Sequence, residues 1–89
     1  MKNITLDLKK MTSIPGMHKD LQKALALPDY YGKNLDALYD CLSTYPEPIA
    51  VEVPQAVGDS KYLGDYGKQL LLVFQDAAED NSDLTVKLI

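Results

Sequence analysis

The chain has 89 residues, of which 46% are hydrophobic and 25% are charged. This length suits one small domain, because two cores in so short a chain would each be too small to fold unaided. No apolar run approaches the roughly 18–20 residues that a membrane-spanning helix needs, and the charged N-terminal segment lacks the apolar stretch of a secretory signal. We therefore expect a single globular domain over residues 1–89, located in the cytoplasm and without membrane contact.

The charge balance argues against nucleic acid as a direct ligand. The chain contains thirteen Asp and Glu residues, nine Lys residues and no Arg, which gives a formal net charge of −4. Binding to phosphates draws on concentrated cations, so a cationic partner suits this chain better. A single cysteine, Cys41, excludes an internal disulfide, and a single histidine, His18, leaves too few ligands for a zinc site. We expect no metal and no cofactor, a buried Cys41 thiol, and His18 on the surface or at a helix cap.

The N-terminal half of the chain reads as one strand followed by two helices. Apolar and polar residues alternate over residues 2–8, which is the period of a half-buried strand. Apolar residues at helical spacing predict a first helix that Thr12 or Ser13 caps and that Pro28 ends. After a loop, Asn34 is expected to cap a second, short helix.

The C-terminal half contributes two further strands and at least one helix. Residues 49–53 form a short apolar run, and residues 83–89 alternate, so both segments predict strands. Between them, residues 55–62 are ambiguous, and a clear helical stripe surrounds Phe74. The expected fold is α/β, with a three-stranded, mainly parallel sheet packed against three to four helices. The predicted core comprises Leu6, Leu21, Leu25, Leu35, Leu38, Leu42, Val51, Leu70, Phe74 and Val86.

The second helix carries charges that weaken the helix itself. On a helical wheel, Asp36, Tyr39 and Asp40 lie on a face distinct from that of the core leucines. The two carboxylates are i,i+4 neighbours of like charge, which destabilises a helix by a few tenths of a kcal/mol. Asp40 also lies near the C-terminus, where the helix dipole disfavours an anion by roughly 0.3–1 kcal/mol. A residue that weakens its own helix suggests a use in binding.

The last helix repeats this pattern on its flank. Asp76 and Asp80 are again i,i+4 like charges near a C-terminal end, and Val73 shares their side of the helix. If the two helices lie side by side, their acids form one negative patch. Such a patch attracts a cationic cleft and accelerates encounter with it.

Tyrosines concentrate beside the acidic face of the second helix. Four of the six lie between residues 30 and 45, and Tyr39 shares the face of the two carboxylates. Exposed tyrosine next to acids on a rigid helix is typical of a protein-binding surface. We expect Tyr31 to pack under the loop, whereas Tyr30 could either pack there or stand free.

At these residues the chain resembles a known family. The run LALPDYYGKNLDALYDCL over residues 25–42 is similar to the central signature of the barstar family, intracellular inhibitors of barnase-type bacterial ribonucleases. The first strand, the flanking helices, residues 73–77 and the closing strand fall in the same register. The resemblance implies a barstar-like fold, no enzymatic activity, a monomer when free, and one-to-one inhibition of a secreted ribonuclease.

The resemblance also assigns residue roles. Asp40 is expected to enter the cleft where RNA phosphate binds, Asp36 to pair with a cation at its edge, and Asp76 to add an ion pair. Tyr30 is expected to pack against the catalytic histidine of the nuclease, and Tyr39 and Tyr45 to fill an aromatic rim. The complete set of expected nuclease-binding residues is Tyr30, Asn34, Asp36, Tyr39, Asp40, Thr44, Tyr45, Val73, Asp76 and Asp80.

Departures from the family pattern leave alternatives open. The family prefers Trp at the positions of Tyr39 and Tyr45, and the segment 43–48 is about one residue shorter than in its type member. An immunity or adaptor protein could use the same acidic face against a different toxin or partner. A hydrolase could use Asp36 and Asp40 as an acid/base pair, but no cleft or orienting His, Cys or Ser is evident beside them.

Overall fold

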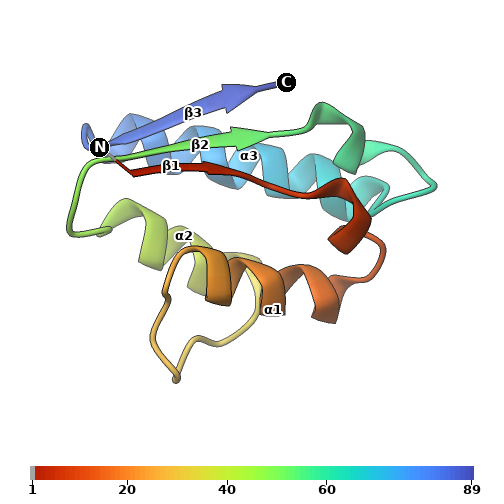
Figure 1. Cartoon of the computed structure of the whole chain (residues 1–89), viewed down its shortest axis with the longest axis horizontal. Coiled ribbons are helices and arrows are strands. Elements are labelled where there is room, and N and C mark those ends of the chain that lie inside the picture. The colour runs from red at the N-terminus through yellow and green to blue at the C-terminus, as the bar shows by residue number, and fades with distance from the viewer. Residues whose placement is uncertain (1) are drawn as a thin grey trace.

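A computed structural model describes residues 2–89 of the chain and has the predicted order of elements (Figure 1). The first strand ends at Thr5 and is shorter than expected, because a short 3-10 helix begins at Leu8. The ambiguous segment after residue 54 is a second 3-10 helix. The elements are β1 (Lys2–Thr5), η1 (Leu8–Lys10), α1 (Ile14–Ala24), α2 (Leu35–Ser43), β2 (Ile49–Val53), η2 (Gln55–Gly58), α3 (Asp65–Asp80) and β3 (Leu84–Leu88).

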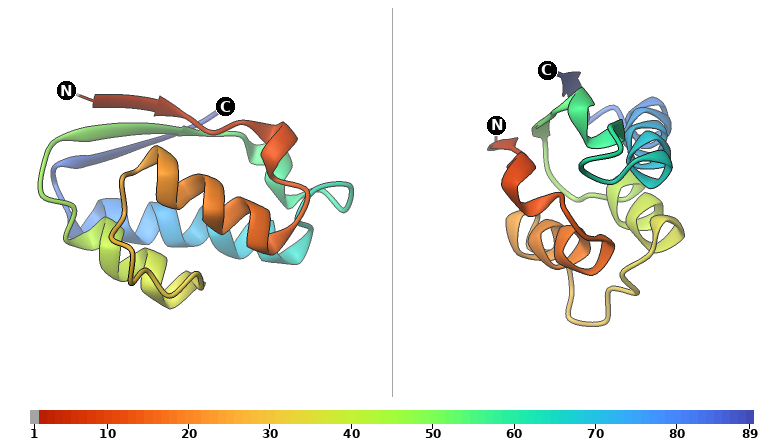
Figure 2. Two further views of the ribbon diagram at one scale, coloured as in Figure 1. Left: turned by 60° about the horizontal axis from the view of Figure 1, so that its bottom comes forward. Right: turned by 90° about the vertical axis from the view of Figure 1, so that its right-hand side faces the viewer.

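The sheet has the order β1-β2-β3, and both strand pairs are parallel, which confirms the predicted topology. Parallel neighbours require crossover connections, and here α1 and α2 connect β1 to β2, while α3 connects β2 to β3. Figure 2 shows that the three helices lie on one side of the sheet. The strand register places Ile4, Val51 and Val86 side by side in a row that faces these helices.

The opposite face of the sheet is polar. Asn3, Thr5, Thr85 and Lys87 are exposed, and they alternate along the edge strands with the inward-facing residues. The Thr5 hydroxyl donates a hydrogen bond to the Glu52 carboxylate over 2.6 Å, across the β1–β2 pair. Parallel sheets are usually covered on both faces, and this polar surface explains how one face of so small a sheet can stay uncovered.

The core lies between the sheet and the helices. Eight of the ten predicted core residues are buried, and the remaining two, Leu35 and Val86, are half-buried against the cluster. Leu35 lies in the first turn of α2, and Val86 lies on an edge strand, so each has fewer neighbours on one side.

Helix α1 begins as predicted but ends earlier. The Ser13 hydroxyl accepts a hydrogen bond from the Gly16 N–H over 3.1 Å, so Ser13 is the N-cap. The helix ends at Ala24, not at Pro28. Ala26 adopts a left-handed conformation with φ 52°, and this turn ends the helix before the proline is reached.

Candidate functional site

Helix α2 is positioned by a well-formed cap. The Asn34 side-chain oxygen accepts a hydrogen bond from the Ala37 N–H over 2.8 Å, which confirms the predicted N-cap. Its amide group donates to the Gly32 carbonyl over 3.3 Å. Asn34 therefore uses both ends of its side chain to join the preceding loop to the helix, and its expected contact with a nuclease stays a prediction.

The two faces of α2 separate as the helical wheel predicted. Leu38 and Leu42 are fully buried, whereas Asp36 and Asp40 are exposed. Within residues 2–89, neither of these carboxylates forms an ion pair with a lysine. Their negative charge is thus presented to solvent without a neutralising partner from the described chain.

Helix α3 brings its own acids alongside α2. Asp76 and Asp80 are exposed, and Val73 is half-buried. Figures 1 and 2 show the two helices side by side, and the Tyr39 hydroxyl donates a hydrogen bond to the Asp80 carboxylate between them. Tyr39 is consequently half-buried rather than fully exposed. We call the surface formed by Asp36, Tyr39, Asp40, Asp76 and Asp80 the acidic surface.

Tyr30 projects from the loop that precedes α2. It is 88% exposed, which settles the alternative that the sequence left open, while Tyr31 packs beneath the loop as expected. The loop is held by two hydrogen bonds to the Pro28 carbonyl, one from the Gln22 side chain over 2.9 Å and one from the Tyr31 N–H over 3.0 Å. A large aromatic side chain thus stands free on a fixed piece of backbone, as in protein-binding surfaces.

Tyr45 is largely buried, so only a small part of its ring is available to the expected aromatic rim, and its contact with a nuclease stays a prediction. Its side chain is only 8% exposed, and its hydroxyl donates to the Leu25 carbonyl over 2.9 Å. Tyrosine can be buried here because a partner for its hydroxyl lies within reach. Together with Tyr30 and Thr44, the ring lines a hollow of about 250 Å³, whose other lining residues are Ala26, Leu27, Pro28, Cys41 and Pro46.

The C-terminus of α2 depends on contacts that the sequence did not predict. The Thr44 and Ser43 hydroxyls both donate to the Asp40 carbonyl, over 2.7 Å and 3.2 Å. From the end of α3, the Asn81 amide donates to the Leu42 carbonyl over 3.0 Å. No local sequence pattern predicts this last contact, because 39 positions separate the two residues in the sequence.

His18 is buried, contrary to the expectation that it lies on the surface. Its side chain is 0% exposed; Nδ1 lies 2.6 Å from the Tyr31 hydroxyl, and Nε2 lies 2.7 Å from the Tyr66 hydroxyl. Two tyrosines therefore satisfy both ring nitrogens, which allows a histidine on the inner face of α1. Tyr66 lies on α3, far away in sequence. The cluster connects α1, α3 and the loop that carries Tyr30.

This cluster predicts that acid destabilises the protein. Burial lowers the pKa of His18 below its usual 6.5, and burial raises the pKa of Tyr31, which stays protonated as a hydrogen-bond partner. The stabilising contribution of neutral His18 is complete above pH 6.5 and is lost as the pH falls through the lowered pKa. Urea unfolding between pH 7.5 and 5 should show this loss, with a slope of at most about 1.4 kcal/mol per pH unit from one proton. In His18→Gln the decline over this range should be smaller; an equal decline would contradict the assignment.

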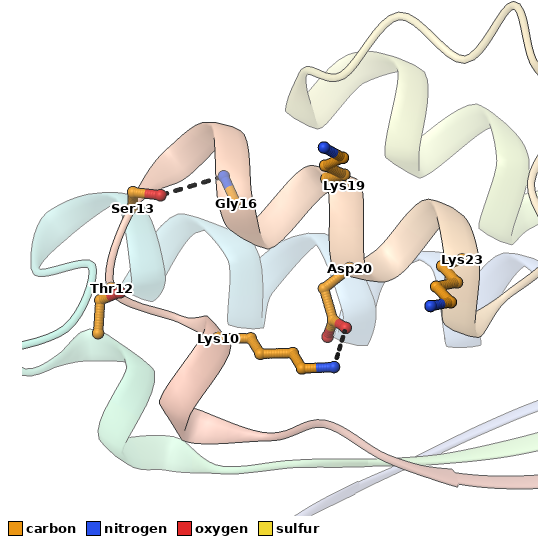
Figure 3. Close-up of a pocket in the computed structure, with 7 residues that line it drawn as sticks. All are labelled: Lys10, Thr12, Ser13, Gly16, Lys19, Asp20 and Lys23. Atoms are coloured by element: carbon orange, nitrogen blue, oxygen red, sulfur yellow. Dashed lines mark hydrogen bonds and ion pairs between the residues drawn. The ribbon is translucent and has the colours of Figure 1, made fainter.

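Another hollow, of about 370 Å³, lies along α1 and is lined by none of the expected nuclease-binding residues. Lys10 Nζ and Asp20 Oδ1 form an ion pair across it, 3.3 Å apart. Lys19 points away from this pair in Figure 3, so the basic groups do not converge on one point. Because the carboxylate also offsets part of the positive charge, this hollow is a weaker candidate than the acidic surface.

Within residues 2–89, no group of three or more His, Cys, Asp or Glu side chains is arranged to hold a metal ion. In the same part of the chain, no helix is long and apolar enough to cross a membrane. Cys41 is half-buried rather than buried, and burial together with the neighbouring Asp40 raises the pKa of its thiol.

Comparison with known proteins agrees with the resemblance seen in the sequence. Residues 1–89 match the family described as Barstar (barnase inhibitor). The chain is also 37% identical over 84 residues to a protein of Bacillus subtilis (strain 168) named "Putative ribonuclease inhibitor YrdF". That alignment covers 93% of this chain and 92% of the relative. The family match includes every residue of the acidic surface.

Proposed function

Because the chain belongs to the barstar family, we propose that it is a ribonuclease inhibitor that binds one-to-one into the active site of a barnase-type ribonuclease. The observation that carries this proposal is the acidic surface itself. Its four carboxylates are exposed and form no ion pair with a lysine within residues 2–89, and the ring of Tyr30, on the loop that leads into α2, is exposed as well.

The proposed mechanism is mimicry of the RNA phosphate. A ribonuclease has to hold cationic groups around the phosphate that it cleaves, and a carboxylate can occupy those groups without offering a bond to break. Asp40 takes the central place, because it is the exposed carboxylate of α2 nearest in sequence to Cys41 and Thr44, which line the hollow together with Tyr30. Asp36 and Asp76 pair with cations at the edge of the cleft.

Uncharged groups around the acids complete the interface. Tyr30 packs against the catalytic histidine of the nuclease and covers the ion pairs from water, which strengthens them. Tyr39 on α2 and Val73 on α3 contribute half-buried side chains. Tyr45 contributes only the part of its ring that lines the hollow, so Tyr30 provides most of the aromatic contact.

The charge distribution also suits rapid capture. The net charge of −4 and the clustered acids attract a cationic protein and repel RNA, so nucleic acid is not a direct ligand. We propose that the protein acts in the cytoplasm as a monomer of one domain, where it protects the cell from a nuclease destined for secretion. It needs no catalytic residue and no cofactor for this role.

An RNA-hydrolysis assay tests this function directly. A barnase-type ribonuclease is titrated with the protein, and we expect activity to fall linearly to zero at one equivalent, because a tight inhibitor removes one active site per molecule. Circular dichroism of the same sample establishes that the protein is folded. If the folded protein leaves hydrolysis unchanged at tenfold excess, the acidic surface serves a different toxin or partner, and the nuclease assignment is wrong.

A further inference from the structure

The C-terminal end of α2 is capped in part by its own neighbours: the Thr44 hydroxyl donates to the Asp40 carbonyl, and the Tyr45 N–H donates to the Leu42 carbonyl over 3.3 Å. Its last turn contains no basic residue, and neither its C-cap, Thr44, nor the following residue, Tyr45, has the positive φ that commonly ends a helix. Asp40 adds a negative charge in the same turn, where the helix dipole is already negative. A donor from elsewhere in the fold would add to these local hydrogen bonds and hold the end of the helix against its neighbour.

Asn81, directly after α3, supplies such donors. Its side-chain nitrogen donates to the Leu42 carbonyl over 3.0 Å and to the Tyr45 carbonyl over 3.4 Å. Its side-chain oxygen accepts from the Asp83 N–H over 3.0 Å, which fixes the orientation of the amide. One half-buried side chain thereby joins the end of α2, the segment after it and the start of β3.

The preceding residue reaches the same helix. Asp80 accepts the hydrogen bond from the Tyr39 hydroxyl, so two consecutive residues at the end of α3 hold α2 at two points. We call this pair of contacts the α2–α3 clamp. Asp40 lies between the two held points, at Tyr39 and Leu42. The clamp thus restrains the backbone that carries the central carboxylate of the acidic surface.

We propose that Asn81 is a positioning residue for this surface, which holds the C-terminal turn of α2 so that the Asp40 carboxylate is in place before the partner arrives. This inference rests on the proposed function. A group that is ordered in advance loses less conformational freedom on binding, so an intact clamp increases affinity without touching the partner. Asn81 is not among the ten residues expected to contact the nuclease, and its role is carried entirely through α2.

The test compares four variants of the full chain: Asn81→Ala, Asp40→Asn, the double variant, and Ser13→Ala. Ser13→Ala is the matched control, because it removes a single helix cap on α1 that lies outside the acidic surface. Inhibition constants are measured against a barnase-type ribonuclease, and unfolding is followed in urea. Amide hydrogen exchange is recorded on each free protein, so that one readout does not depend on any nuclease.

We expect Asn81→Ala to weaken inhibition at least tenfold, whereas Ser13→Ala, although similarly destabilised, inhibits like the unmodified protein. In the Asp40→Asn background the effect of Asn81→Ala should shrink to less than threefold, which a general loss of stability would not produce. An undiminished effect in that background, or normal inhibition by Asn81→Ala, overturns the proposal.

Hydrogen exchange separates failure of this inference from failure of the proposed function. In free Asn81→Ala, exchange at the Thr44 and Tyr45 amides should accelerate at least tenfold more than exchange in α1. If the unmodified protein inhibits no ribonuclease but this acceleration is seen, the function is wrong and the clamp stands as a restraint on α2. Unchanged exchange at those two amides overturns the clamp whatever the nuclease assay gives.

Discussion

Replacing Asp40 with alanine is expected to weaken inhibition by about 2–5 kcal/mol while leaving the protein folded and slightly more stable. The loss follows because truncating one side of a buried charge pair leaves the opposing cations of the nuclease without a partner. It corresponds to an increase in Kd of roughly 30- to 4,000-fold. The gain in stability, about 0.3–1 kcal/mol, follows because the substitution removes an anion from the C-terminal turn of α2.

Inhibition assays and urea unfolding on the same preparation measure both effects. Asp59→Ala is the matched control, because it removes the same charge from an exposed position just after η2, outside the acidic surface. It should change inhibition by less than about threefold. If Asp40→Ala unfolds the protein, the interpretation of Asp40 as an exposed binding residue of α2 is wrong. If both variants weaken inhibition equally, the charge of the chain matters but the position of Asp40 does not.

The fold was largely predictable because most of its determinants are local. The alternation of apolar and polar residues in the strands, the apolar stripes of the helices and the caps at Ser13 and Asn34 can all be recognised in short stretches of sequence. The structure confirms them. The acidic residues of α2 and α3 could be identified because they destabilise their own helices. Their exposure in the structure agrees with that reasoning.

Most of the contacts that were missed join residues distant in sequence. His18 looked like a surface residue because its neighbours are polar, and its burial becomes possible through hydrogen bonds to Tyr31 and to Tyr66, which the packing of α3 brings close. Tyr45 looked like a free aromatic, and only the Leu25 carbonyl shows that it points inward. Asn81 carries no local signal at all. The position of a polar side chain of this kind depends on its hydrogen-bond partner, and the tertiary fold determines which partner lies within reach.

Substituting Gly67 with alanine is expected to destabilise the protein by about 2 kcal/mol or more, although alanine is the better helix former. Gly67 is buried in α3 where the helix meets η2, and a Cβ atom there would lie 1.9 Å from the Val57 carbonyl oxygen. The gain in helix propensity is only about 1 kcal/mol. Overpacking of a core typically costs about 1–3 kcal/mol, and a clash with backbone, which cannot be relieved by a side-chain rotation, lies at the upper end or beyond.

Gly58→Ala, on the other side of the same contact, is the control for this prediction. A Cβ atom there meets the Lys68 side chain at 3.0 Å, and that exposed, flexible chain can move aside, so stability should change by less than about 0.5 kcal/mol. Urea unfolding of both variants measures the difference. Equal stabilities would mean that α3 and η2 separate easily. Gly67 is about 13 Å along α3 from Asp76. The folded fraction of Gly67→Ala should therefore inhibit normally, so that this substitution lowers stability without changing inhibition.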